Sequence, residues 1–304
     1  MINLTFEFEV KEPLGTGLHG RVYRVEESTT HDSYACKDIQ MANPALRHLQ
    51  KSEVKGEILI LKKLRHTHII TLAAYIEDTA GFRILLDPLA DCNLEEYLDD
   101  CAGENFDSSR TEPIYSWFAC LLTGLQFAHS MDVKHQDIKP TNFLVKSRHI
   151  YISDFSLAKD FTGDKSRIAG EAAAGNWRYG APETRDNTAG GREADVFSLG
   201  CVFSEMLTVI HGRSHKDLER ECKTERRTDI FRKCLLLLEK WLGEIDKKAR
   251  DGNRTRTICT TILYMIAETE VKRYSAHRAL TQIEEVPELA CKHQHYIDPA
   301  GKSA

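Results

Sequence analysis

Four polar residues with complementary chemistry lie at short, fixed offsets near the middle of the chain. Asp137, Lys139 and Asn142 fall within six residues, and Asp154 follows before Phe155. The Asp137 carboxylate could accept a hydroxyl proton, and the Lys139 ammonium could neutralise a phosphoryl group during transfer. Asn142 and Asp154 offer the oxygen ligands that Mg²⁺ takes. Phosphoryl transfer needs mainly positioning and charge neutralisation, so the order and spacing favour that chemistry over a loop of scattered polar residues.

The pattern of residues in the first third of the chain predicts a β-sheet. Apolar residues alternate with charged ones, or gather in short runs between turn signals. Five antiparallel strands are expected at 6–10, 22–25, 34–39, 69–75 and 83–87. Apolar residues at helical spacing between 54 and 64 predict one helix after Pro44.

Helical periodicity dominates from Asn93 onward, and the two halves are expected to meet near Pro88. The segment at 196–207 is almost wholly apolar, which indicates a central helix. Further helices are expected at 117–129, 230–241 and 258–266. The predicted fold class is therefore α+β.

The order of the polar residues resembles the catalytic loop and metal loop of protein kinases. The matching segments are His135-Gln136-Asp137-Ile138-Lys139-Pro140-Thr141-Asn142 and Asp154-Phe155-Ser156. The resemblance implies a two-lobed kinase fold. It divides the chain into a nucleotide-binding lobe at 1–88, a mainly helical catalytic lobe at 89–290 and a tail at 291–304. It also implies ATP as phosphoryl donor, Mg²⁺ as cofactor and a protein substrate.

A glycine-rich loop lies between the first two expected strands, at Gly15, Gly17 and Gly20. Such spacing alone is weak, because a dinucleotide site would need a helix directly after it, whereas 21–25 continues as a strand. An ordinary hairpin is the alternative. The resemblance implies that the loop folds over the triphosphate, where the lack of Cβ atoms lets the backbone approach the phosphates.

Lys37 holds the position of the phosphate-contacting lysine of the family. Its expected partner is Glu57 on the helix, and Glu53 is the nearest rival. An ion pair there would aim the lysine at the α- and β-phosphates. By the same resemblance, Leu86 is expected to line the back of the adenine pocket. The backbones of Asp87 and Leu89 are expected to form hydrogen bonds with the adenine edge. The residues expected to sandwich the ring are Leu14, Val22, Ala35 and Leu144.

The resemblance also suggests which acceptor is phosphorylated. Lys139, two residues after the proposed base Asp137, is typical of serine/threonine kinases. The segment 175–183 is similar to the end of an activation segment, and Arg273 is expected to pair with its Glu183. His135 is expected to be structural and to pack toward the central helix.

Several positions depart from the family pattern. Gln136 replaces an arginine that normally binds a phosphorylated loop, so activity is expected not to depend on loop phosphorylation, although Thr162 and Ser166 could be modified. Ser156 replaces a glycine and is expected to hinder a flip of the metal loop. Asn176 replaces a threonine that supports the catalytic residues, and segment 211–253 has few of the family's landmarks.

These departures keep two alternatives open beside an active serine/threonine kinase. The first is a pseudokinase that binds nucleotide or a partner and transfers phosphate poorly. The second is a small-molecule kinase of related fold, which the protein-substrate platform at 175–183 disfavours.

Composition limits the partners. The net charge of −5 and the pI near 6.2 predict no general attraction to nucleic acid or anionic membranes. The sequence is expected to carry no secretory signal. It is also expected to have no apolar run long enough to span a membrane. The cytosol or nucleus is therefore the predicted compartment. The nine cysteines form no C-x-x-C pair. Cys291, His293 and His295 are expected to form a polar tail, because no second ligand pair lies near them at zinc-finger spacing.

Overall fold

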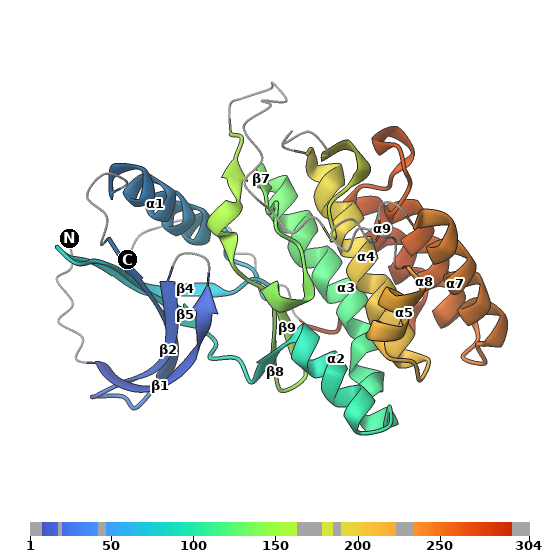
Figure 1. Ribbon diagram of the computed structural model, residues 1–304, viewed down its shortest axis with the longest axis horizontal. Helices are drawn as coiled ribbons and strands as arrows, with labels where there is room; N and C mark the ends of the chain where they lie inside the picture. The colour runs from blue at the N-terminus through green and yellow to red at the C-terminus, as the bar shows by residue number, and fades with distance from the viewer. Residues whose placement is uncertain are drawn as a thin grey trace.

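A computed structural model describes residues 8–17, 20–41, 47–162, 178–184, 190–222, 231 and 234–293. The first lobe is a five-stranded antiparallel sheet in the order β1-β2-β3-β5-β4, as the alternation predicted (Figure 1). Its strands are β1 (Phe8–Gly17), β2 (Gly20–Glu27), β3 (Ser33–Gln40), β4 (Thr71–Glu77) and β5 (Gly81–Asp87).

One helix, α1 (Arg47–Lys63), packs against this sheet. Val54 and Ile58 on the helix share a buried cluster with Ile39, Phe82 and Ile84 on the strands. Burying each such side chain contributes about 1.5–3 kcal/mol, so this contact fixes the helix on the sheet. The glutamates of α1 are thereby held at a defined distance from β3.

The second lobe is mainly helical, and α4 runs through its centre (Figure 1). Phe118 on α3 and Phe203 on α4 meet edge to face, with ring centroids 4.7 Å apart. The predicted central helix is confirmed, although it begins before the expected segment. The helices are α2 (Leu94–Gly103), α3 (Ser108–Ser130), α4 (Arg192–Ile210), α5 (His215–Glu221), α7 (Leu235–Lys248), α8 (Asn253–Met265) and α9 (Ala276–Glu284). The helix expected at 230–241 lies partly outside the described residues, and α7 continues beyond it.

Short strands in the second lobe were not predicted. They are β6 (Cys92–Asn93), β7 (Val133–Lys134), β8 (Phe143–Lys146), β9 (His149–Ile152) and β10 (Lys159–Asp160). Strand β7 pairs with β10, while β6, β8 and β9 form a second small sheet. Strands of two to four residues are too short to show a period of two. They hold both ends of the polar loops, because one loop connects β7 to β8 and the other connects β9 to β10.

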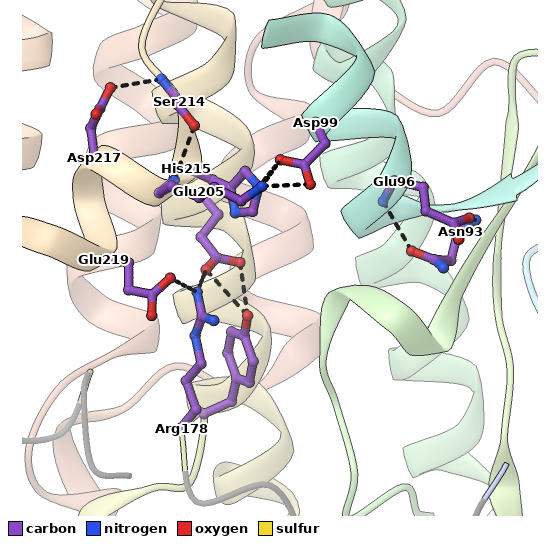
Figure 2. Close-up of polar contacts among 11 residues, drawn as sticks. Asn93, Glu96, Asp99, Arg178, Glu205, Ser214, His215, Asp217 and Glu219 are labelled. Atoms are coloured by element: carbon purple, nitrogen blue, oxygen red, sulfur yellow. Dashed lines mark hydrogen bonds and ion pairs between the residues drawn. The ribbon is translucent and has the colours of Figure 1, made fainter. Parts of the chain in front are cut away.

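Two helices of this lobe begin with reciprocal caps, which Figure 2 shows. The Glu96 amide donates to Asn93 Oδ1 at 3.1 Å, and the Asn93 amide donates back to Glu96 at 2.9 Å. Ser214 and Asp217 form the same arrangement at the start of α5. Each cap satisfies backbone amides that have no partner inside the helix.

The chain leaves the sheet at the end of β5, Asp87. The two-lobed kinase-like division is thus observed, while the boundaries 1–88, 89–290 and 291–304 stay a prediction. Within the described ranges, no single helix has both the length and the apolar character to cross a membrane. One sharply bent pair, α4 with α5, meets those criteria by length and composition together.

Candidate active site

A cleft of about 650 Å³ lies where the two lobes meet. Its walls come from β1, β2 and β3 on one side and from β8 and the two polar loops on the other. Apolar side chains line the inner part, and acids, an amide and lysines line the rest. The predicted site residues that line it are Leu14, Gly15, Val22, Ala35, Lys37, Glu57, Leu86, Leu89, Asp137, Lys139, Asn142, Leu144 and Asp154.

Two predicted ligand residues that the structure describes, Gly20 and Asp87, are not among those that line the cleft. A Cβ atom on Gly20 would come within 2.2 Å of the Asp38 carbonyl oxygen, so the strand pairing itself requires glycine there. A Cβ on Gly15 would meet nothing within 4 Å, which leaves room beside that backbone for a ligand. The tip of the loop, residues 18–19, lies outside the described part of the chain.

Lys37 on β3 forms a buried ion pair with Glu57 on α1. Its Nζ donates to the two carboxylate oxygens at 2.7 and 3.0 Å, and to Asp154 Oδ1 at 3.3 Å. Glu53, the rival partner, is exposed. Burial disfavours the charge on Lys37, but Glu57 and Asp154 outweigh this effect and raise the pKa of the amine. The lysine is therefore a fixed cation at the top of the cleft.

Asp137, Lys139 and Asn142 converge on the floor of the cleft. Lys139 Nζ donates to Asp137 Oδ2 at 2.6 Å. The Asn142 amide nitrogen donates to the same oxygen at 2.9 Å and to the Asp137 backbone carbonyl at 2.7 Å. The other carboxylate oxygen, Asp137 Oδ1, is buried and has no hydrogen-bond partner among the residues that the structure describes. Burying a hydrogen-bond acceptor without a donor costs free energy. A substrate hydroxyl that donates to this oxygen would remove that cost.

The central helix positions this loop through one carboxylate. Asp195 in the first turn of α4 accepts hydrogen bonds from the backbone amides of His135 and Gln136, at 2.9 and 2.8 Å. His129 donates to the same carboxylate at 3.0 Å. Burial would raise the pKa of Asp195, but the hydrogen bond from His129 and its charge outweigh burial and lower the pKa. The expected structural role of His135 agrees with these contacts, and its ring also packs on Phe155 with centroids 4.8 Å apart.

Asp154 has an unusual backbone conformation, with φ of 57° in the left-handed region. Such conformations cost free energy and gather at functional sites. Burial would raise its pKa, but the Lys37 ammonium and a hydrogen bond from Ser156 outweigh burial and lower it. Ser156 is not among the residues with positive φ, so the serine fits this loop without the strain that a required glycine would imply.

One contact that the sequence did not suggest joins α1 to the segment after the metal loop. Lys63 in the last turn of α1 donates to Asp160 Oδ2 at 2.8 Å and to Thr162 Oγ1 at 2.7 Å. Thr162 was considered only as a modification site. The other predicted modification site, Ser166, and the departure at Asn176 lie outside the described residues.

The predicted ion pair of Glu183 and Arg273 is confirmed. Arg273 donates from both terminal nitrogens to the carboxylate, at 2.6 and 3.1 Å. A neighbouring group was missed, because Glu205 lies in the apolar helix α4 and is fully buried. Figure 2 shows its carboxylate facing Arg178, which donates at 2.8 Å, and the Tyr179 hydroxyl donates to it as well. Both groups tie the segment at 178–184 to the helical lobe.

Comparisons with known proteins match this geometry. A family model for the protein kinase domain matches residues 8–283. Cyclin-dependent kinase C-2 C of Arabidopsis thaliana is 33% identical over 219 residues, which cover 68% of this chain and 32% of the plant protein. A probable cell division protein kinase of Encephalitozoon cuniculi is 29% identical over 272 residues, which cover 84% of this chain and 95% of that protein. Mitogen-activated protein kinase kinase kinase A of Dictyostelium discoideum is 28% identical over 212 residues, which cover 68% of this chain and 22% of that protein.

Proposed function

We propose that this chain, which belongs to the protein kinase family, transfers the γ-phosphoryl group of ATP to serine and threonine hydroxyls of protein substrates. Protein phosphotransfer follows from the family. The specific acceptor, the nucleotide and the Mg²⁺ requirement are our proposal. The chain spans about a third of the plant relative, so the activity and substrates of that larger protein are not carried over.

The buried Asp137 Oδ1, which has no hydrogen-bond partner within the described part of the chain, is the observation that carries this proposal. Lys139 and Asn142 occupy the other carboxylate oxygen, so the free oxygen is the one that can orient an acceptor hydroxyl and take its proton. Lys139 would then neutralise the phosphoryl group as it passes from nucleotide to acceptor. This arrangement has no evident use in a purely structural loop.

The upper side of the same cleft suits a nucleotide. Lys37, fixed by Glu57, would contact the α- and β-phosphates. The glycine loop at Gly15, Gly17 and Gly20 would cover the phosphates. For the base, we propose backbone hydrogen bonds from Asp87 and Leu89 and an apolar sandwich of Leu14, Val22, Ala35 and Leu144, with Leu86 behind.

The donor set at the junction of the two loops fits Mg²⁺. Asp154 stays ionised because its pKa is lowered, and it lies at the edge of the cleft. Asn142 donates from its nitrogen to Asp137, which leaves its amide oxygen available to a cation. Oxygen ligands of this kind suit a hard divalent ion, which when bound would neutralise charge on the phosphates. Asp154 and Asn142 are therefore the proposed metal ligands.

Serine/threonine specificity is supported by Lys139. Its 2.6 Å contact with Asp137 places a cation beside the proposed base, in the position that resembles serine/threonine kinases. The Encephalitozoon and Dictyostelium relatives are named as protein kinases, which supports a protein substrate. The identity of that substrate stays open.

Radiolabelled ATP and a generic protein substrate test the proposal directly. Wild-type protein should incorporate phosphate in the presence of Mg²⁺, and acid hydrolysis should release phosphoserine and phosphothreonine. Asp154→Ala should abolish incorporation, whereas Asp91→Asn, at a carboxylate that also lines the cleft but bonds Lys146, should retain it. Label on tyrosine alone would overturn the acceptor assignment. Nucleotide binding without turnover would overturn the enzymatic one.

A further inference from the structure

Two histidines and two cysteines from three distant segments converge away from the cleft. His68 lies in the turn between α1 and β4, Cys120 lies in the middle of α3, and Cys291 and His293 follow the single turn at 287–289. Their side-chain donor atoms all lie within 4.8 Å of one another. His68 and Cys120 are fully buried, and Cys291 and His293 are half-buried. None of the four lines the candidate active site.

Four of the six separations between the donor atoms, at 3.1–3.7 Å, are close to those of a tetrahedral coordination shell. Cys291 Sγ lies 3.1 Å from His68 Nε2 and 3.3 Å from Cys120 Sγ. His293 Nδ1 lies 3.6 Å from Cys120 Sγ and 3.7 Å from Cys291 Sγ. Sulfur and nitrogen atoms that share a zinc ion at about 2.3 and 2.0 Å, at tetrahedral angles, lie about 3.3–3.8 Å apart.

A second contact prepares His68 to act as a ligand. Its other ring nitrogen, Nδ1, lies 3.0 Å from the carbonyl oxygen of Ile150. A carbonyl can only accept, so Nδ1 carries a proton, and Nε2, the nitrogen nearer Cys291, is the one that can bind a metal. Metal-bound histidines characteristically have their second nitrogen held in this way. The turn itself is fixed, because the His68 carbonyl accepts from the Ile152 amide at 2.9 Å.

A disulfide describes this cluster less well than a metal site. The two sulfurs are 3.3 Å apart, whereas a disulfide bond measures about 2.05 Å. A disulfide would also leave the two imidazoles facing the cluster without a role. Two thiolates and two neutral imidazoles form a donor set typical of Zn²⁺, and four protein ligands leave no open position for chemistry.

We propose that His68, Cys120, Cys291 and His293 bind one Zn²⁺ ion as a structural site. The ion takes the place of the two thiol protons, which pass to solvent. It would fasten the segment at 291–293 to α3 and to the turn that leads into β4. The expectation of a polar tail rested on the lack of a second ligand pair at zinc-finger spacing in the sequence, but His68 and Cys120 come close in space from distant positions. His295, the third residue of that expectation, lies outside the described residues.

Elemental analysis of the full chain, purified without chelator, tests the proposal. We expect about one Zn²⁺ per chain in the wild type. In Cys291→Ser and in Cys120→Ser the zinc content should fall to that of chelator-treated protein. Cys101→Ser is the matched control for Cys120→Ser, because both cysteines are fully buried in helices, and it should keep its zinc. His149→Gln should also keep it, although the His149 ring lies 4.1 Å from that of His293.

Cobalt substitution of the wild type supplies a readout that does not depend on a variant folding. Co²⁺ should give the visible absorption of a tetrahedral ion and a thiolate charge-transfer band, and both should be lost in Cys291→Ser. A wild type without zinc and without this spectrum would overturn the proposal, as would a Cys120–Cys291 cross-link in the purified protein. These readouts need no phosphotransfer, so they are independent of the proposed function.

Discussion

Asp137 shows how individual side chains define the proposed chemistry. One oxygen of its carboxylate is held by Lys139 and Asn142, and the other is buried without a hydrogen-bond partner in the described ranges. Both contacts come from residues within one short loop. The sequence identified these residues by their spacing, but it did not predict the contacts between them. The contact of the Asp195 carboxylate with the loop backbone joins residues about sixty positions apart, and no sequence spacing could indicate it.

Replacement of the proposed base tests this arrangement. Asp137→Asn keeps the shape of the side chain and removes its basicity, so kcat should fall about 10²–10⁴-fold while KM for ATP changes little. Steady-state kinetics against ATP measure both. Asp91→Asn alters another acid of the same cleft and should change neither parameter greatly. An equal loss in both variants would contradict a specific role for Asp137.

At the scale of elements, two polar contacts near the cleft add to the apolar packing that fixes α1 on the sheet. Glu57 binds Lys37 in the interior, and Lys63 binds Asp160 and Thr162 at the helix end. The first contact was predicted from the resemblance to the protein kinase family, whose helix Glu57 and the residues after it match. The second was not, because β10 is only two residues long and gives no recognisable pattern.

Loosening the helix end should lower activity moderately. Lys63→Ala removes a partly exposed ion pair, worth about 0–1 kcal/mol, so kcat should fall by less than about tenfold with little change in thermal stability. Lys62→Ala is the control, because the neighbouring lysine lies over the Tyr75 ring instead. Identical activity of Lys63→Ala and wild type would show that the tie does not support the active position of α1.

Activity should not depend on phosphorylation of the activation segment. Gln136 offers no charge to a phosphate at the position where an arginine would, and the contact of Lys63 with Thr162 already forms without one. Phosphatase treatment, checked by mass spectrometry, should therefore leave the phosphotransfer rate unchanged. Loss of activity that returns on rephosphorylation would refute this expectation.

The contact of Glu183 with Arg273 anchors the segment at 182–184 to the helical lobe. Arg273 is fully buried at its side chain, so Glu183→Ala leaves a buried charge with weaker compensation from the Ala267 and Glu193 carbonyls. We expect a loss of about 1.5–3 kcal/mol in the free energy of unfolding and a lower soluble yield. Glu112→Ala breaks an exposed pair with Arg254 and should cost about 0–1 kcal/mol. Denaturant unfolding of both variants measures the difference, and equal stability would count against the anchor.

At the scale of the whole molecule, the sequence was sufficient for the two lobes and the residues between them. Long periodic segments such as α3 and α4 carry a clear apolar pattern, and β4 in the first lobe alternates between exposed and half-buried residues, whereas Val10 of the expected first strand is exposed. What could not be predicted depends on the fold bringing distant positions together. Glu205 looked like part of an apolar helix, and the cluster of His68, Cys120 and Cys291 joins residues more than fifty positions apart.

The proposed phosphoryl transfer requires that the cleft between the lobes holds a nucleotide and a divalent ion opposite Asp137. Calorimetric titration of the wild type with ATP, with and without Mg²⁺, measures this requirement most directly. We predict binding that Mg²⁺ strengthens, and we predict that Asp154→Asn removes the strengthening. No binding of ATP or of its magnesium complex at millimolar concentration would contradict the central claim.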